Sequence, residues 1–163
     1  MLKERFKELE EKTLLAIKTF YGDRLVSVVI FGSVARETQN FHSDIDLLII
    51  AHGLPDGRIK RVREFEAVEE KIGPLLKTLQ GVGIDTGLSP ILKTPAEAER
   101  GSPLFLDMVE DAKVLFDRGR FFSGILAKLR DRLKALGAKR VWRGNVWHWV
   151  LKPDFKPGEV FEL

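Results

Sequence analysis

Apolar residues recur at spacings of three and four at the start of the chain, which predicts an amphipathic helix over residues 2–20. Two largely apolar runs of strand length follow, Leu25–Phe31 and Ile45–Ala51. Because both runs have apolar residues on both faces, we predict two central strands that are covered on both faces of a sheet. A short helix over 33–37 and a polar loop over 38–43 are expected to connect them.

The middle of the chain returns to helical spacing and then to a strand. Apolar residues from Ile59 to Leu79 recur at every third or fourth position, so we predict a helix there. Gly73-Pro74 is expected to break or kink this helix near its end, because proline cannot donate a helical hydrogen bond. Gly81-Val82-Gly83 then turns the chain into a third predicted strand, from Ile84 to Leu92.

The remainder of the chain predicts further helices and strands. These are a helix that starts at Thr94-Pro95-Ala96-Glu97, a helix over 103–110, a strand over 113–116, a helix over 122–136 ended by Gly137, a terminal strand or hairpin over 141–151 and an irregular tail. Strands that alternate with helices predict an α/β (α+β) fold with a mixed central sheet flanked by helices. We expect one core over 1–117, and a C-terminal helix plus Trp-containing strand segment over 118–163 packed on the same domain.

Composition limits the class of protein. A chain of 163 residues with 44% apolar and 31% charged side chains fits one globular domain. No apolar run is long enough to cross a bilayer, and the charged start is unlike a signal peptide, so we expect a cytoplasmic protein with no membrane partner. The chain has no cysteine, which excludes disulfides, thiolate-bound zinc and cysteine nucleophiles.

Charge is distributed unevenly along the chain. Residues 1–117 carry 16 basic and 20 acidic side chains, whereas residues 118–163 carry 11 basic and 4 acidic ones together with all three Trp. A basic segment with aromatic residues could bind a polyanion such as RNA, although a solvated helix face with core Trp explains it equally simply. Trp147 and Trp149 share one face of a strand, so we expect them to pack against the preceding helix.

Two acids on a predicted helix also need an interpretation. Asp107 and Asp111 are one helical turn apart. We expect them on a solvated face or at the helix end, rather than at a reactive site.

The candidate chemistry lies between the two central strands. Gly32 lets a ligand approach the backbone closely, and Ser33 adds a hydroxyl at the start of a short helix, a combination that suits the phosphates of a nucleoside triphosphate. Asp44 and Asp46 are two apart at the head of the next strand, so their side chains point to the same face. Hard carboxylate oxygens of this kind bind Mg²⁺, and two-metal sites serve in-line displacement at phosphorus.

Gly32-Ser33-Val34-Ala35-Arg36, the ten-residue spacing from Ser33 to Asp44, and Ser43-Asp44-Ile45-Asp46-Leu47-Leu48-Ile49 together resemble the nucleotidyltransferase signature of the DNA polymerase beta superfamily. The closest likeness is to its small prokaryotic members. The resemblance implies that Gly32, Ser33, Arg36 and Ser43 line the nucleotide site and that Asp44 and Asp46 bind two Mg²⁺ ions. Glu37 stands where the family often has Gly.

The resemblance also implies a third carboxylate on a later strand, which acts as base toward the incoming hydroxyl. Asp85 is the only acid on the third predicted strand and therefore the best candidate for this catalytic and metal-binding position. Ser89 takes the same position if the strand is shifted in register, and the site would then hold only two acids.

The implied reaction moves a nucleoside monophosphate from a triphosphate to a hydroxyl and releases pyrophosphate. The acceptor is open, with an antibiotic, a protein side chain and an RNA end as alternatives. Small members of the family often work with a separate protein, so residues 118–163 could contribute an acceptor surface or a dimer interface. The competing hypothesis is a nucleotide-binding or partner-binding module of the same fold with little or no catalysis.

Overall fold

The computed structural model describes residues 1–163 and has a four-stranded sheet at its centre. The strands are β1 (Leu25–Phe31), β2 (Ile45–Ala51), β3 (Leu88–Lys93) and β4 (Lys113–Asp117), in the spatial order β3-β2-β1-β4. β3 runs parallel to β2, and the other two pairs are antiparallel. The expected mixed α+β architecture is therefore confirmed, with β1 and β2 in the middle of the sheet.

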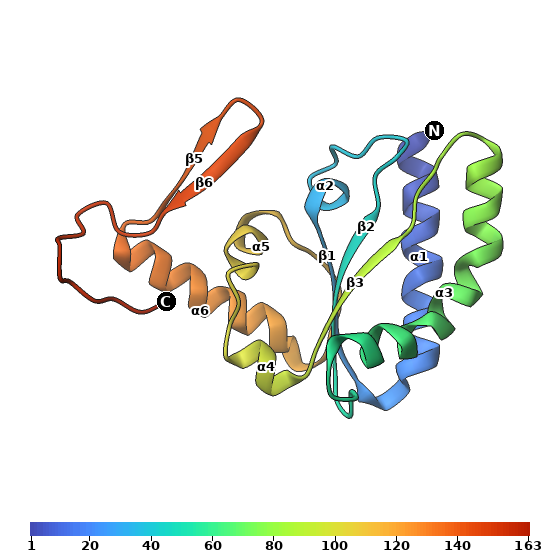
Figure 1. The fold of residues 1–163 in the computed structure, drawn as a ribbon, viewed down its shortest axis with the longest axis horizontal. Helices are drawn as coiled ribbons and strands as arrows, with labels where there is room; N and C mark the ends of the chain where they lie inside the picture. Colours follow the sequence, from blue (N-terminus) through green and yellow to red (C-terminus); the bar gives the residue numbers. More distant parts are fainter.

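Helices cover both faces of the sheet, as Figure 1 shows. One face carries α1 (Leu2–Tyr21) and the longest helix, α3 (Arg58–Gly81). The other face carries α4 (Pro95–Glu99), α5 (Phe105–Asp111) and α6 (Phe121–Leu136). None of the helices has a stretch long and apolar enough to span a membrane.

Short elements complete the chain. The connections contain η1 (Gly22–Arg24), α2 (Gly32–Ala35) and η2 (Arg118–Arg120). After α6 the chain forms a hairpin of β5 (Lys139–Arg143) and β6 (Val146–Val150), which lies beside α2 and α5 in Figure 1. The hairpin confirms the predicted strand or hairpin at this end of the chain.

Side chains of the central strands divide between two hydrophobic cores. Leu47 and Ile49 of β2 enter the core under α1 and α3, whereas Leu48 and Ile50 enter the core under α5 and α6. This alternation is the period of two that every strand has, so it explains why both central strands have apolar residues on both faces. It also places Asp46 on the same face as Leu48, which is the face covered by α5 and α6.

Most predicted elements are confirmed. β1 and β2 have the predicted bounds, Thr94 and Glu97 form a capping box, and Gly137 ends α6 in a left-handed conformation. α3 continues through Pro74 as one helix, so the expected break is absent. The helix changes direction along its length (Figure 1).

The predicted third strand was wrong at its start. β3 begins at Leu88 and not at Ile84, because the preceding backbone bonds elsewhere. The Ile84 N–H donates to Leu79 O and the Asp85 N–H donates to Phe41 O, at 3.0 and 2.8 Å. Asp85 therefore lies in the loop before β3 and not on the strand.

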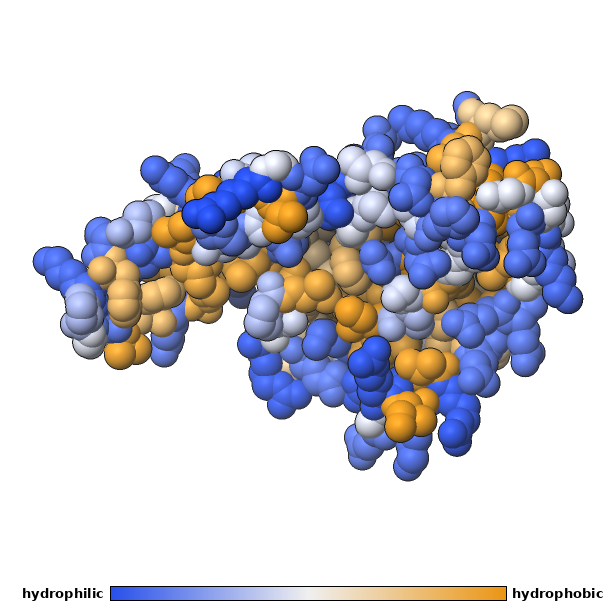
Figure 2. Space-filling view, turned by 45° about the horizontal axis from the view of Figure 1, so that its top comes forward, coloured by the Kyte–Doolittle hydropathy of each residue, from blue (hydrophilic) through white to orange (hydrophobic).

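The C-terminal segment exposes several hydrophobic side chains. Val146 on the hairpin and Phe155 and Val160 in the tail are 69%, 49% and 89% exposed. Figure 2 shows hydrophobic groups of this segment, on the left, between hydrophilic ones. This end of the molecule is therefore less thoroughly packed than the sheet, whose central strands are almost wholly buried.

Candidate active site

Three chain segments meet at the edge of the sheet where β1 ends and β2 and β3 begin. Phe31 at the end of β1 pairs with Asp46 of β2, which in turn pairs with Ser89 of β3. Gly32 follows directly and has φ +75°, a left-handed conformation that favours glycine. A Cβ at Gly32 would collide with the Asp46 carboxylate, so this position needs glycine for both its conformation and its contact.

Asp44 and Asp46 form a pair of neighbouring carboxylates. Asp46 is half-buried and Asp44 is exposed, and a Cβ on Gly87 would lie 3.5 Å from Asp44 Oδ1. Burial raises the pKa of Asp46, the negative charge of Asp44 raises it further, and Arg36 and a hydrogen bond from Ser89 act in the opposite direction. The pair therefore carries more negative charge than its surroundings neutralise.

The loop from Gly32 to Ser43 holds the residues expected to contact a nucleotide. Ser33 accepts hydrogen bonds at its backbone oxygen from Thr38, and its hydroxyl makes none within the chain. The Ser43 hydroxyl accepts from the Asn40 N–H at 2.9 Å, while the Ser43 carbonyl accepts from Thr86 Oγ1 at 2.6 Å. Ser43 thus ties the loop to the segment before β3, and Ser33 remains free to bind a ligand.

Glu37 keeps the loop shape for which the family often uses glycine. Its φ is +58°, one of only two positive values among the non-glycine residues. The Glu37 carboxylate pairs with Lys3 at 2.9 Å on the exposed surface. Glu37 therefore adopts the left-handed turn that suits glycine, and its backbone is strained there.

The two candidates for the third position lie in different places. Ser89 occupies the strand position opposite Asp46, and its hydroxyl acts to lower the pKa of that carboxyl. Asp85 is exposed in the loop two residues before Gly87, and its carboxylate forms no ion pair or hydrogen bond within the chain. The register shift considered from the sequence is therefore the arrangement that the strand adopts.

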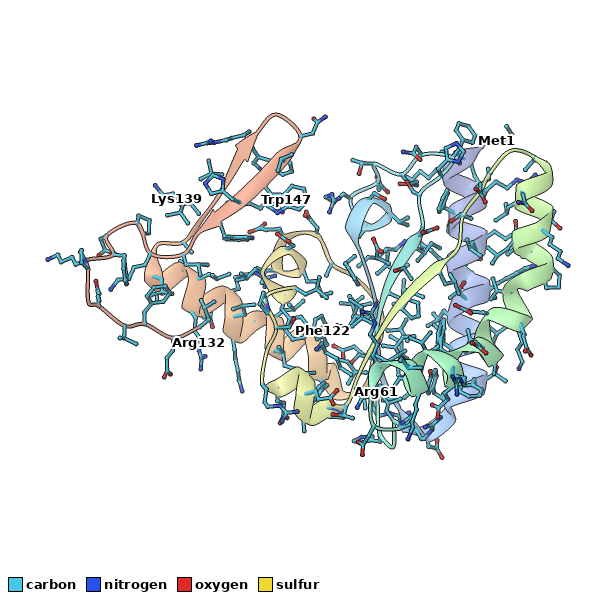
Figure 3. The ribbon with its side chains drawn as sticks, viewed as in Figure 1. Met1, Arg61, Phe122, Arg132, Lys139 and Trp147 are labelled. Carbon is cyan, nitrogen blue, oxygen red and sulfur yellow. The ribbon has the colours of Figure 1, made fainter.

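The hairpin contributes a contact that sequence reasoning missed. The guanidinium of Arg36 stacks over the ring of Trp147, 4.7 Å from its centroid, and Figure 3 shows Trp147 on β6. The indole N–H groups of Trp147 and Trp149 both donate to Asp107 Oδ1 of α5, at 2.5 and 3.1 Å. No periodicity links Arg36 and Trp147, so the only sequence signal was the clustering of Trp in a basic segment.

Two smaller expectations are confirmed only in part: Asp111 does lie at the end of its helix, and Trp149 does pack beside the preceding helix. Asp107 and Asp111 do not lie on a solvated face, because both are half-buried and bonded to the hairpin. Asp111 pairs with Arg140 of β5 at 2.7 Å. Trp147 consequently packs toward α5 and α2, whereas Trp149 contacts the core that also contains the preceding helix α6.

Comparison with known proteins identifies the class to which this site belongs. The sequence model of the nucleotidyltransferase domain matches residues 10–115. The chain belongs to this nucleotidyltransferase family. The protein is therefore a transferase, and Asp44 and Asp46 both fall inside the matched nucleotidyltransferase domain.

The chain is also similar to a curated protein and to solved structures. The nucleotidyltransferase is 32% identical over 128 residues to "Putative protein adenylyltransferase MJ1305" of Methanocaldococcus jannaschii, a match that covers 77% of this chain and 82% of the relative. Among solved structures, a toxin–antitoxin with AMP-PNP is 18% identical with a TM-score of 0.44, covering 78% of this chain and 92% of that one. The toxin–antitoxin MntA-HepT is 18% identical with a TM-score of 0.44, covering 80% and 88%.

Proposed function

We propose that the protein transfers AMP from ATP to a hydroxyl of a protein substrate, with release of pyrophosphate and with Mg²⁺ held by Asp44 and Asp46. The observation that carries this proposal is the carboxylate pair beside the Gly32-Ser33 turn, at the open edge of a sheet within a nucleotidyltransferase domain.

The aspartate pair fits a divalent cation. Asp46 is half-buried beside a second carboxylate, and burial, together with the negative charge of Asp44, raises its pKa. Carboxylate oxygens are preferred ligands of Mg²⁺, so the ion would supply the missing charge. When bound, Mg²⁺ neutralises charge on a triphosphate and lowers the pKa of an attacking hydroxyl.

Residues of the loop would bind the triphosphate. Gly32 leaves its backbone open to the ligand, Ser33 offers an unpaired hydroxyl, and Arg36 offers a guanidinium without an ion pair. Arg recognises phosphate through two parallel N–H donors, which makes it well suited to this position. These groups would orient the donor for attack at the α-phosphate.

Asp85 would accept the proton of the acceptor hydroxyl. The Asp85 carboxylate has no partner within the chain, and its loop contacts the loop that carries Ser43. Ser89 would then orient Asp46 through its hydrogen bond. This division of roles explains how a site with a serine in the third strand position could still activate a hydroxyl.

Support for a protein acceptor and for ATP comes from the relative that is 32% identical and carries the name of a protein adenylyltransferase. The protein acceptor would bind where β1 ends and β2 and β3 begin. The basic segment 118–163 has fewer free positive charges for binding RNA than its net charge suggests, because Arg140 is already paired with Asp111.

The first experiment measures donor binding. Isothermal titration with ATP, GTP, CTP and UTP in the presence of Mg²⁺ should detect binding of ATP to the wild-type protein. Asp44→Asn and Asp46→Asn should each weaken it by tenfold or more, since a two-charge cation site loses half of its ligands, a loss of at least about 1.4 kcal/mol. Asp131→Asn, an exposed aspartate on α6, is the control and should bind as wild type does.

The second experiment finds the acceptor. The protein is incubated with α-labelled ATP and a cell extract, and the label should appear in a band that protease removes and RNase does not. Asp85→Asn should keep ATP affinity and lose label transfer, whereas Ser89→Ala should lower both. Absence of ATP binding by the wild type, or unchanged binding by both Asn variants, would contradict the proposed function; label in RNA would reassign the acceptor.

A further inference from the structure

Arg36 reaches the candidate site with its hydrogen-bonding edge free. Its backbone N–H ends α2 by donating to Gly32 O at 3.2 Å, while its guanidinium forms no ion pair and no hydrogen bond within the chain. The stacking on Trp147 is the one contact found for this guanidinium. Stacking on a ring uses the planar face of a guanidinium, whereas its five N–H donors lie in the plane. All five donors of Arg36 therefore remain available to hydrogen-bond a phosphate.

Trp147 is itself fixed from two sides. Its N–H donates to Asp107 Oδ1 on α5, and its ring lies 4.9 Å from the ring of Trp142, its cross-strand partner. The guanidinium of Arg140 lies over both rings and is anchored by Asp111 on α5. The orientation of the Trp147 ring is thus determined by α5 and by the hairpin together.

The stack lies on the face of the sheet where Asp46 projects. Asp46 shares a face with Leu48, whose core includes α5, and Trp147 is bonded to α5. Arg36 is also tied to the carboxylate pair through the backbone, because its N–H donates to Gly32 O at 3.2 Å and Gly32 lies against the Asp46 carboxylate. A long, flexible side chain gains most from such support, because ordering it costs rotamer entropy.

We propose that Trp147 is a positioning residue that holds Arg36 in place to receive the triphosphate, so that the C-terminal hairpin completes a nucleotide site whose other residues lie within residues 10–115. The inference rests on the proposed function. It assigns the hairpin a role in donor binding through Arg36 alone, and no role in the chemistry at the acceptor.

The test is a set of binding titrations with ATP and Mg²⁺ on the full chain. Trp147→Leu should raise the dissociation constant roughly 3- to 30-fold, the range that a cation–π contact spans. Trp147→Phe keeps an aromatic face and should recover most of the affinity, although it lacks the N–H for Asp107. The matched control is Trp149→Leu. This variant removes a Trp of the same strand whose N–H donates to the same Asp107 oxygen, and it leaves the stack of Arg36 on Trp147 in place.

A double-mutant cycle separates positioning from a general effect on the fold. In an Arg36→Ala background, Trp147→Leu should cause no further loss of affinity, because the residue that Trp147 supports is absent. A further loss in that background, or equal losses from Trp149→Leu and Trp147→Leu, would overturn the proposal. If wild type binds ATP and Asp46→Asn does not, while Trp147→Leu binds as wild type does, the positioning role fails and the proposed function stands.

Discussion

At the scale of single residues, Glu37 shows how a loop tolerates an unsuitable side chain. A left-handed conformation costs a non-glycine residue about 1–2 kcal/mol, and an exposed ion pair such as Lys3–Glu37 returns less than that. The turn persists because the neighbouring hydrogen bonds from Thr38 to Ser33 fix it on both sides.

Glu37→Gly should therefore stabilise the protein by about 0.5–1 kcal/mol, after allowance for the greater entropy of glycine in the unfolded chain. Urea unfolding at neutral pH measures the change in free energy of unfolding. Glu37→Ala is the control, since it removes the ion pair and keeps the strain, and it should not stabilise. A Glu37→Gly variant no more stable than Glu37→Ala would mean that the turn is not strained.

Residues near one another in sequence could be assigned to the site without a structure. Gly32 and Asp46 flank a single connection between paired strands, so a turn glycine and a strand-initial acid must meet. The stack of Arg36 on Trp147 joins residues that are far apart in the chain. Such a contact depends on how α5 and the hairpin pack, and no local pattern encodes it.

At the scale of elements, the strands differ in how well their bounds could be predicted. β1 ends where an apolar run meets Gly32, and β2 begins directly after Asp44, so hydrophobic burial sets those limits. The start of β3 depends instead on which backbone groups bond: Ile45 N–H donates to Gly87 O, and the residues before Gly87 bond to Leu79 and Phe41. The β-branched side chains of Ile84 and Thr86 favour a strand, and for this reason the strand was predicted to begin at Ile84 rather than at Leu88.

The junction of β4 and α6 depends on one carboxylate. Asp117 accepts hydrogen bonds from the N–H groups of Phe122 and Ser123, both at 2.9 Å, and from the Ser27 hydroxyl at 2.7 Å. Burial acts to raise the pKa of Asp117, and these hydrogen bonds bring it below its usual range. The side chain therefore ties the first turn of α6 to β1.

Asp117→Ala should destabilise the protein by about 2 kcal/mol, because it leaves two helix N–H groups and a buried hydroxyl without an acceptor. Thermal unfolding followed by circular dichroism measures the loss. Asp117→Asn keeps an acceptor oxygen and should lose less than the Ala variant. Equal melting temperatures for wild type and Asp117→Ala would show that the junction does not limit stability.

At the scale of the whole molecule, one ion pair joins the two faces of the sheet. Arg61 of α3 forms a bidentate pair with Glu97 of α4 at 2.6 and 2.9 Å, and Arg61 also donates to the Leu92 carbonyl of β3. The hydrogen bond from Arg61 lowers the pKa of Glu97 to about 2. The pair is largely shielded from water, so its charge interaction is less screened than that of surface pairs.

Stability should therefore fall in acid through Glu97. A carboxyl whose pKa is lower in the folded than in the unfolded state stabilises fully above the unfolded pKa, and the contribution is lost as pH falls from about 4.5 to about 2. Glu97→Gln should cost about 2 kcal/mol at pH 6 and progressively less toward pH 2. Urea unfolding across this range measures it, with Glu110→Gln as an exposed control; a difference that does not change with pH would refute the linkage.

The position of the hairpin after α6 has a consequence for how the protein is made. Synthesis proceeds from the N-terminus, so the sheet, the glycine turn and both aspartates are available before Trp147 is added. The support for Arg36 thus forms last. On the proposed role of Trp147, unfinished chains and chains clipped after α6 by a protease would retain both aspartates and bind the nucleotide more weakly than the full chain does, so the full affinity would be reached only after translation through the hairpin.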